Sequence, residues 1–201
     1  MDQANAGPNG GEPLEIREAT VADAAACTAI YRPYVLDTVI TFETEPPSAE
    51  AMAVRIGAAL QAYAWLVLTD AGRVVGYAYG GQWKVRAAYR WTAEVSVYLE
   101  VGRRRSGAGR ALYDRLLTRL AERGYLVAIA GMTLPNEPSQ GLHRALGFED
   151  VGSTAGSVGR TGPGTTSPGC SGPSVRRPSS RVSPGDRALS LHPRPEPAPA
   201  P

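Results

Sequence analysis

A change in composition after residue 152 limits most strongly what this chain can fold into. Residues 153–201 contain ten Pro, nine Ser and seven Gly, and no Phe, Trp or Tyr. Such a segment lacks the apolar surface that would offset the entropy of ordering the chain. All aromatic residues lie before it, where 15 Lys and Arg nearly balance 17 Asp and Glu. The sequence therefore predicts a flexible N-terminus over 1–13, one domain over 14–152 and a disordered tail over 153–201.

Simple counts argue against several classes of protein. No stretch approaches the roughly 18 consecutive apolar residues of a membrane span, and the first residues lack the basic and apolar parts of a signal peptide. Cys27 and Cys170 are the only cysteines, too few for a disulfide framework or a paired-cysteine zinc site. Basic residues are scattered apart from one triplet, which gives a nucleic-acid surface little support. We expect a cytoplasmic protein with no metal, no membrane contact and no nucleic acid, whose partner is a small molecule.

The hydrophobic pattern predicts an α/β layout with a mixed sheet. Alternating apolar residues indicate strands, and apolar residues three and four apart indicate helices. We expect strands over 14–19, 64–70, 73–81, 91–101 and 125–133, and helices over 24–36, 49–63, 107–123 and 136–145. Pro33 is expected to end or kink the first helix, and Ala71-Gly72 to form a hairpin turn. The last strand is almost uniformly apolar, which predicts burial on both faces.

Gly107 and Gly109 open the third helix, directly after a strand and a short loop. A helix N-terminus offers unpaired N–H groups and about half a positive charge, which suits a pyrophosphate. Glycines there let phosphate oxygens approach the backbone, and the arginine triplet 103–105 adds positive charge. Alone, this pattern is equally typical of a basic loop with a glycine turn. The sequence contains neither of the glycine-rich fingerprints GxGxxG and GxxxxGK[ST].

The segment Arg104–Gly109, RRSGAG, resembles the R/Q-x-x-G-x-G/A motif of the GCN5-related N-acetyltransferases, the GNAT superfamily. Four further blocks resemble those of the phosphinothricin N-acetyltransferases and follow that family's order: ITFETEP at 40–46, WKVRAAYRWTAE at 83–94, LPNEPS at 134–139 and LHRALGF at 142–148. The resemblance covers residues 14–152. It implies a GNAT fold, a mixed central sheet flanked by helices. It also implies transfer of acetyl from acetyl-CoA, the co-substrate, to the primary amine of phosphinothricin or a similar small amino acid.

The resemblance also assigns roles to single residues. It places the pyrophosphate on Arg104, Arg105, Ser106, Gly107, Ala108 and Gly109, and the pantetheine arm along Val97, Tyr98 and Leu99, with Asn136 as a hydrogen-bond partner. Glu94 becomes the general base, and His143 the acid that protonates the departing thiolate. The residues themselves leave alternatives open, namely an exposed strand glutamate, a structural histidine and, for Asn136, a plain helix N-cap.

Recognition of the acceptor falls, by the same resemblance, to Phe42, Lys84, Arg86 and Tyr89. Cations at 84 and 86 suit the carboxylate and phosphinate of an amino-acid analogue, and Phe42 is expected to form an apolar wall. Without the resemblance, Lys84, Arg86 and Tyr89 are equally typical of a solvated loop, and Phe42 of a core contact.

The similarity stops after Gly152. Family members continue with two strands around a GWKxGxWxDVxW block, whereas this chain continues STAGSVGRTGPGTTSPGCSG. We expect the C-terminal strands to be missing and suspect a frameshift, because one set of codons for 154–170, read one base earlier, encodes YRRVGWKDGAWHDVAWL. Losing two strands would leave the strand at 125–133 with an open edge. It would also argue against the homodimer that the family resemblance implies.

Three other functions stay open on the sequence alone. The same motifs would serve a broad amino-acid or methionine sulfoximine acetyltransferase. An altered C-terminus would favour a catalytically impaired module that only binds CoA. A nucleic-acid contact through the arginine triplet and the tail would predict strongly salt-dependent binding.

Overall fold

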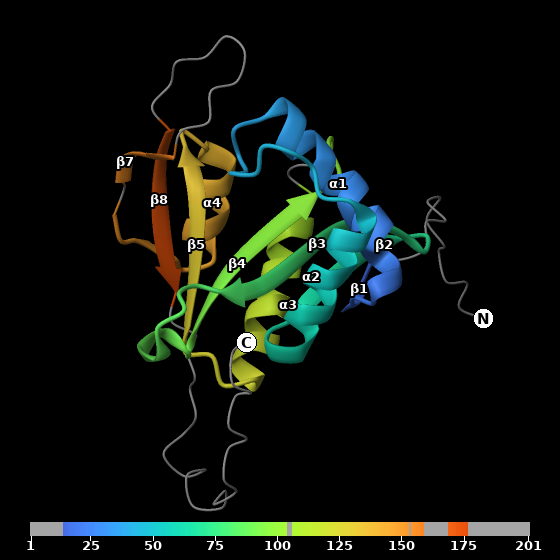
Figure 1. The fold of residues 1–201 in the computed structure, drawn as a ribbon, viewed down its shortest axis with the longest axis horizontal. Coiled ribbons are helices and arrows are strands. Elements are labelled where there is room, and N and C mark those ends of the chain that lie inside the picture. Colours follow the sequence, from blue (N-terminus) through green and yellow to red (C-terminus); the bar gives the residue numbers. More distant parts are fainter. Residues whose placement is uncertain (1–13, 104–105, 153, 159–168, 177–201) are drawn as a thin grey trace, which may run out of the picture.

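A single mixed sheet forms the centre of the protein (Figure 1). The computed structural model describes residues 14–103, 106–152, 154–158 and 169–176. The strands are β1 (Glu15–Glu18), β2 (Trp65–Asp70), β3 (Arg73–Gln82), β4 (Thr92–Leu99), β5 (Val127–Leu134), β6 (Glu149–Asp150), β7 (Thr154–Val158) and β8 (Gly169–Arg176). The helices are α1 (Ala24–Asp37), α2 (Ala49–Ala62), α3 (Ala108–Glu122) and α4 (Glu137–Ala145), with the 3₁₀ turns η1 (Val21–Asp23) and η2 (Ala87–Tyr89). The expected α/β class is confirmed.

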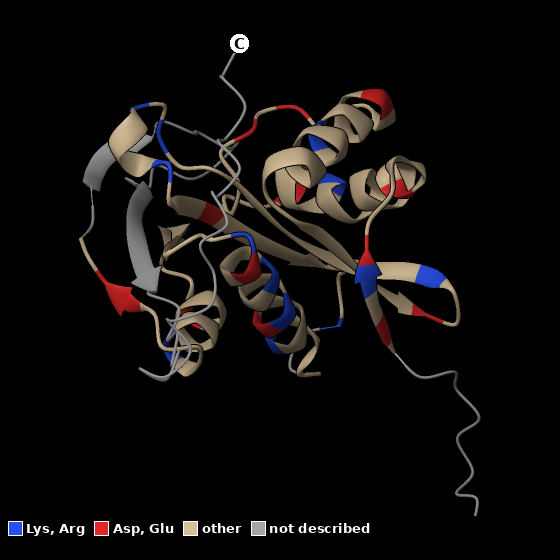
Figure 2. Ribbon diagram, turned by 90° about the horizontal axis from the view of Figure 1, so that it is seen from below, with Lys and Arg blue, Asp and Glu red and all other residues tan. Residues whose placement is uncertain are grey.

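The strands follow the order β1-β2-β3-β4-β5-β8-β6, with β7 on β8. Helices α1 and α2 cover one face of this sheet, and α3 and α4 lie on the other (Figures 1 and 2). Two hydrophobic cores result, because successive side chains of a strand point to opposite faces. On β2, Leu66 packs into the core with α3, whereas Val67 packs into the core with α1 and α2. None of the helices in the described part of the chain is long and apolar enough to cross a bilayer.

Local signals in the sequence set several element boundaries. Ala71 and Gly72 both have positive φ, 50° and 75°, the conformation of a two-residue type I′ hairpin turn. Gly107 caps α3 in the left-handed region, and Gly124 follows its end with φ 90°. The expected effect of Pro33 is wrong in part, because α1 continues through it to Asp37. Buried side chains on both sides of the proline anchor the helix in one core, and that burial outweighs a missing hydrogen bond.

The expectation that strands are missing after residue 152 is wrong for the described residues. β7 and β8 are present, and β8 pairs antiparallel with β5 from Ala128↔Arg176 to Leu134↔Cys170. Pairing along a strand uses main-chain groups, which Ser and Gly carry as well as any apolar residue. β5 therefore has a neighbour where an open edge was expected. The expectations for 1–13 and 177–201 fall outside the described residues.

The burial of β5 also differs from the sequence prediction. Its even-numbered residues Ala128, Ala130 and Met132 are buried, whereas Val127 and Ile129 are half-buried and Gly131 is exposed. One face of the strand packs into the core with α3. The opposite face borders a cavity at Gly131, so that of its residues only Thr133 is buried.

Asp23 joins β1 to the start of α1. Its Oδ1 accepts from Arg17 Nη2 at 2.7 Å, and its Oδ2 accepts from Arg17 Nη1 and from the Thr20 N–H, both at 2.8 Å. Hydrogen bonding from Arg17 is the main reason that the pKa of Asp23 lies below its usual 3.8. This carboxylate therefore stabilises the fold above about pH 4, and the stabilisation is lost as the pH falls through the lowered pKa.

Replacing Asp23→Asn is expected to reduce the free energy of unfolding by about 1.5–3 kcal/mol near neutral pH, because charge-assisted hydrogen bonds are lost. Urea unfolding of both proteins at about pH 7 and about pH 3 measures the difference, which should shrink at the lower pH. Asp114→Asn is the matched control, since its ion pair with Arg110 is exposed and should be worth below about 1 kcal/mol. Equal effects of the two substitutions would contradict the assignment.

Candidate active site

A cavity of about 200 Å³ lies on the face of the sheet that α1 covers. Its floor consists of sheet residues, Tyr79 and Gly81 from β3, Glu94, Ser96 and Tyr98 from β4 and Gly131 from β5. Tyr31 of α1 and the segment Ile40–Glu43 form its walls. The cavity thus collects three residues to which the sequence analysis gave different roles: Glu94 as general base, Phe42 in acceptor recognition and Tyr98 along the pantetheine arm.

Glu94 is the carboxylate on the floor of this cavity. Alternation along β4 puts its side chain on the same face as Ser96 and Tyr98. The side chain is half-buried, and burial raises the pKa of its carboxyl group. No cation contacts the Glu94 carboxylate within the part of the chain that the structure describes. A carboxylate in this setting binds a proton more readily than one in water, and this residue is not the freely exposed strand glutamate that the sequence left open.

The cavity exists because β4 and β5 separate. These parallel strands pair only over Thr92–Glu94 and Val127–Ile129, and Figure 1 shows them diverging beyond that point. β4 continues along β3 to the pair Gly76↔Leu99. Its other main-chain edge, from 95 to 99, therefore has no strand partner in the described part of the chain. An extended ligand can pair with such an edge.

The direction of the main-chain groups on this edge follows from one hydrogen bond. The Glu100 N–H donates to the Val75 carbonyl at 2.9 Å, so even-numbered residues of β4 face β3 and Val97 and Leu99 face the gap. The Leu99 carbonyl accepts from the Tyr34 hydroxyl at 2.7 Å. The side chains of Val97 and Leu99 pack into the core with α3, whereas Tyr98 lines the cavity.

The N-terminus of α3 lies just beyond the end of β4. Gly107 has φ 78°, and a Cβ built on it would meet no atom within 4 Å, so the space in front of the helix is open. The Ala108 N–H donates to Ser106 Oγ at 3.4 Å, and the first amides of a 15-residue helix have no partner inside it. Arg104 and Arg105 lie outside the described residues.

Arg103, the first member of the triplet, is part of an ion-pair network. Its guanidinium bonds Asp70, and its Nε donates to Glu100 Oε2 at 3.2 Å. Arg73 binds the same Glu100 carboxylate through two bonds of 2.5 and 2.9 Å. These partners, Arg73 first, lower the pKa of Glu100 to about 2. The charge of Arg103 is thus compensated by acids that the sequence analysis did not connect with it.

His143 and Glu94 do not share a cavity. His143 lies on α4, is only 4% exposed and packs against Phe148 in the region of Tyr113 on α3. Its Nδ1 is 2.7 Å from the Ser139 carbonyl, and its Nε2 is 3.2 Å from the Tyr113 hydroxyl. Because a carbonyl only accepts, Nδ1 carries the proton, and the unprotonated Nε2 can accept from the Tyr113 hydroxyl, whose single proton also faces the Val95 carbonyl at 3.4 Å. Burial lowers the pKa of this imidazole.

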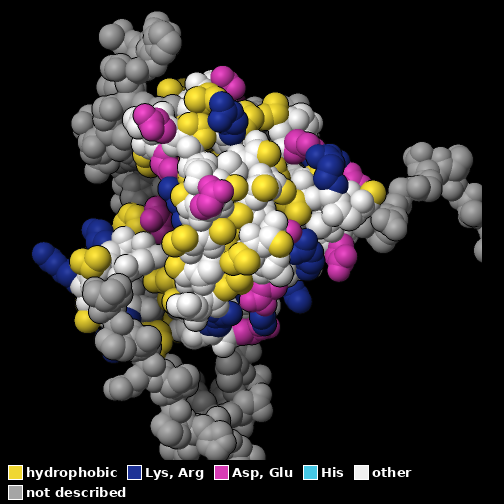
Figure 3. All heavy atoms as spheres, turned by 45° about the vertical axis from the view of Figure 1, so that its right-hand side comes forward, with side chains coloured by type: hydrophobic (Ala, Val, Ile, Leu, Met, Phe, Trp, Pro, Cys, Tyr) yellow, Lys and Arg dark blue, Asp and Glu magenta, His cyan; other side chains and the backbone are white. Residues whose placement is uncertain are grey.

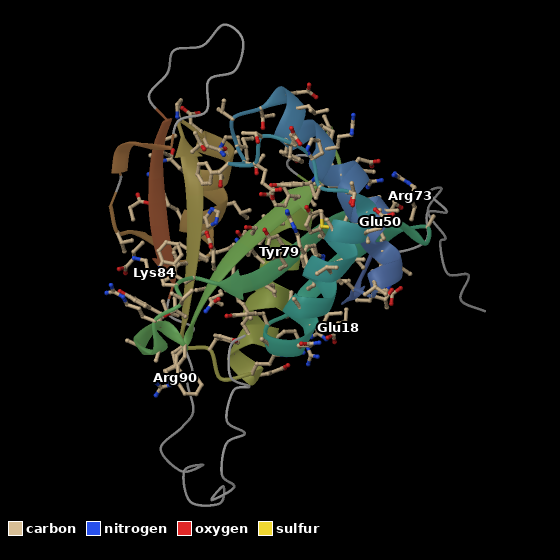
Figure 4. The ribbon with its side chains drawn as sticks, viewed as in Figure 1. Glu18, Glu50, Arg73, Tyr79, Lys84 and Arg90 are labelled. Atoms are coloured by element: carbon tan, nitrogen blue, oxygen red, sulfur yellow. The ribbon has the colours of Figure 1, made fainter. Side chains whose placement is uncertain are left out.

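Lys84, Arg86 and Tyr89 lie in the connection between β3 and β4 and line a second cavity of about 460 Å³. The Lys84 Nζ is 5.5 Å from the centroids of both the Trp83 and the Tyr89 rings. Figure 4 shows Lys84 at the edge of the molecule, away from Tyr79 on the central sheet. Lys84, Arg86 and Tyr89 are therefore separate from Phe42, which lines the Glu94 cavity and, at 46% exposed, is no core contact.

A partly buried hydrogen-bond network that the sequence analysis missed holds the wall of the Glu94 cavity. Arg55 on α2 binds both oxygens of Glu43, at 2.6 and 3.0 Å. The Tyr31 hydroxyl contacts Thr41 and donates to Glu43 Oε1 at 3.1 Å, and burial raises the pKa of Tyr31 to about 12. These bonds tie the segment carrying Phe42 to α1 and α2.

Asn136 is the N-cap of α4, as its Oδ1 accepts from the Ser139 N–H at 3.3 Å. The cap reading of the sequence is therefore confirmed, and a contact with pantetheine stays a prediction. Within the described residues, no group of three or more His, Cys, Asp or Glu could hold a metal ion. On the face seen in Figure 3, acidic and basic side chains are interspersed among apolar ones.

Comparison with known proteins decides the family. The family model of the acetyltransferase (GNAT) domain matches residues 16–159. The chain belongs to this family. In this protein, the open edge of β4 and the N-terminus of α3 follow the point where β4 and β5 separate. The Glu94 carboxylate lies on the floor of the cavity at that point.

Individual relatives of this acetyltransferase are also similar to it in sequence or structure. It is 40% identical over 141 residues to the phosphinothricin N-acetyltransferase of Streptomyces viridochromogenes, a match that covers 70% of this chain and 77% of the relative. It is 40% identical over 139 residues to the L-methionine sulfoximine/L-methionine sulfone acetyltransferase of Pseudomonas aeruginosa, covering 68% and 81%. The crystal structure of a phosphinothricin acetyltransferase from Sinorhizobium meliloti in complex with AcCoA superposes with a TM-score of 0.76 at 35% identity, covering 82% and 88%.

The geometry at His143 predicts a neutral imidazole protonated on Nδ1. Nitrogen-15 NMR is expected to show a protonated Nδ1 and an unprotonated Nε2 at pH values near and somewhat below the usual pKa of 6.5. The variant His143→Gln lacks the His143 signals and so distinguishes them from those of His192, the second histidine of the sequence. Tyr113→Phe should shift the Nε2 signal, because it removes the hydroxyl that donates to Nε2. A doubly protonated His143 at about pH 6.5 would contradict this arrangement.

Proposed function

We propose that this acetyltransferase transfers the acetyl group of acetyl-CoA to the primary amine of a small amino acid of the phosphinothricin or methionine sulfoximine type. The observation that carries the proposal is the position of Glu94, a half-buried carboxylate with a raised pKa on the floor of a cavity beside an open strand edge. The names of the relatives support this class of acceptor.

The residues present fit acetyl-CoA at two places. The amides at the start of α3, with the open space at Gly107, suit a pyrophosphate, and Ser106, Ala108 and Gly109 belong to the same turn. The gap-facing main chain of Val97 and Leu99 suits the amide groups of pantetheine. When bound, acetyl-CoA supplies an acetyl group activated as a thioester.

Glu94 would prepare the acceptor. A primary amine reaches the site as an ammonium ion at neutral pH and attacks only after it loses a proton. Above its raised pKa, Glu94 is ionised and takes that proton directly or through one water. The cavity holds the amine close to the divergence of β4 and β5, so that positioning contributes to the rate as well.

Assignment of the thiolate acid to His143 stays a prediction. In the observed arrangement Nε2 accepts from Tyr113, and the proton on Nδ1 is directed at the Ser139 carbonyl. Protonation of a thiolate by this imidazole through Nε2 therefore requires Nε2 to gain a proton first.

Binding of the acceptor's acidic groups by Lys84 and Arg86 stays a prediction, because both line a pocket separate from the Glu94 cavity. β3 ends one residue after Gly81, and β4 begins two residues before Glu94, its register partner. The connection that carries Lys84, Arg86 and Tyr89 therefore starts beside the proposed base. Its cations suit a carboxylate or phosphinate attached to the carbon that bears the amine.

Glu94→Gln is expected to lower kcat by about 10²- to 10⁴-fold, the usual contribution of a general base, with unchanged binding of acetyl-CoA. A thiol-release assay with phosphinothricin and a calorimetric titration with acetyl-CoA measure the two effects. In the wild type, kcat/KM should fall as the pH drops through the raised pKa of Glu94, and the variant should lack this limb. Glu122→Gln, an exposed glutamate on α3, is the control. Wild-type protein that binds acetyl-CoA and acetylates no amine would instead favour the CoA-binding module.

Lys84→Met and Arg86→Met are expected to raise KM about 10- to 100-fold for phosphinothricin, because a charge-assisted hydrogen bond to a carboxylate is lost. The carboxamide of the same acceptor should show a much smaller change, and KM for acetyl-CoA none. Equal effects on the acid and the amide would show that these cations do not bind the carboxylate.

A further inference from the structure

Four glycines on β3 and β5 fall into two groups. A Cβ at Gly76 would lie 2.5 Å from Leu99 Cδ2, and one at Gly80 would lie 3.0 Å from Leu120 Cδ2. A side chain at either position would therefore displace a leucine that packs on the α3 side of the sheet. At Gly81 a Cβ would meet nothing within 4 Å, and at Gly131 only Glu94 Oε1, at 3.7 Å, which is ordinary contact.

Neither packing nor conformation explains Gly81 and Gly131. Neither residue has positive φ, and glycine inside a strand is destabilising by roughly 0.5–1 kcal/mol relative to alanine. Gly131 also interrupts a strand that is otherwise almost entirely apolar. Glycine inside a strand often marks a place where a ligand approaches the backbone closely.

Both glycines flank Glu94. Gly81 is its register partner on β3. On β5 the register partner is Ile129, and Gly131 lies two residues further on the same face. The Glu94 carboxylate leans toward Gly131, as the 3.7 Å approach shows. The proposed base therefore lies between two positions without a side chain, Gly81 and Gly131, and both line the cavity.

The remaining walls of the cavity are held in place. The Tyr31 and Tyr98 rings meet edge to face with their centroids 4.8 Å apart, and the Tyr79 ring stacks on Trp65 with a centroid distance of 4.4 Å. The ion pair of Arg55 with Glu43 fixes the opposite segment. With these walls fixed, the width of the cavity beside the Glu94 carboxylate depends on Gly81 and Gly131, which have no side chains.

We propose that Gly81 and Gly131 are specificity-determining residues that admit acceptors with a bulky substituent on the carbon that bears the amine. This inference rests on the proposed function. In this arrangement the amine lies at Glu94, and the substituent of the neighbouring carbon occupies the space over the backbone of Gly131. The substrate class is then an α-amino acid with an extended side chain, in preference to glycine or a slender amine.

The test compares Gly131→Ala with the wild type over a series of acceptors of increasing size: glycine, alanine, methionine sulfoximine and phosphinothricin. One methyl group in a pocket changes kcat/KM by about 10- to 200-fold. We expect a loss of about tenfold or more for the two large acceptors, little change for glycine and alanine, and the same KM for acetyl-CoA. Gly57→Ala, on α2 and with nothing within 4 Å of its added Cβ, should match the wild type. A loss of equal size for all acceptors would overturn the proposal.

A second measurement separates this inference from the proposed function. Calorimetry with phosphinothricin in the presence of CoA measures acceptor binding without transfer, and Gly131→Ala should weaken it. A wild type that binds the acceptor and transfers nothing would refute the proposed function alone, whereas undiminished binding by Gly131→Ala would refute the specificity role. If the wild type binds no large acceptor, both fail. Thermal unfolding checks that the variant is folded, and Gly81→Ala, expected to act in the same direction, provides the test if it is not.

Discussion

The separation of β4 from β5 is the constraint on which the rest of the site depends. Three residue pairs hold the strands together, ending at Glu94↔Ile129. Beyond them β4 follows β3, and β5 follows β8. A parallel sheet that stayed paired would leave no free main-chain edge and no cavity between its strands. The proposed base is therefore the last residue of β4 that pairs with β5, and the proposed cofactor edge begins at the next residue.

Two layers of packing keep this gap from closing. On one face the Tyr98 ring contacts the rings of Tyr31 and Tyr77, with centroids 4.8 and 5.4 Å away, and aromatic contacts of this kind add to the stabilisation from burial. On the other face, the Tyr113 hydroxyl lies between the Val95 carbonyl and His143, so that α3, α4 and the first free residue of β4 are connected. The arrangement explains why a histidine that resembles a catalytic acid is so deeply buried.

Features that arise from neighbouring residues could be predicted from the sequence. The Ala71-Gly72 turn and the glycine cap of α3 each depend on a few consecutive positions. The ion pair of Arg55 with Glu43 and the network around Arg103 join residues from different elements, and no local pattern indicates them. β8 was not predicted because its own residues show no strand pattern; it forms a strand by pairing with β5. The family resemblance singled out Glu94 and Phe42, which line one cavity. The separation of Lys84, Arg86 and Tyr89 into another pocket depends on the course of the β3–β4 connection.

The ion pairs of Arg103 have a consequence for the loop that follows it. Asp70 and Arg73 flank the β2–β3 turn, Glu100 follows β4, and Arg103 bridges the two sides. Arg103 thus attaches the segment that leads into α3 to the β2–β3 hairpin. Changes of length or composition between Arg103 and Gly107 would then leave the hairpin in place. They would alter affinity for the pyrophosphate proposed to bind there, while the Glu94 cavity keeps its shape.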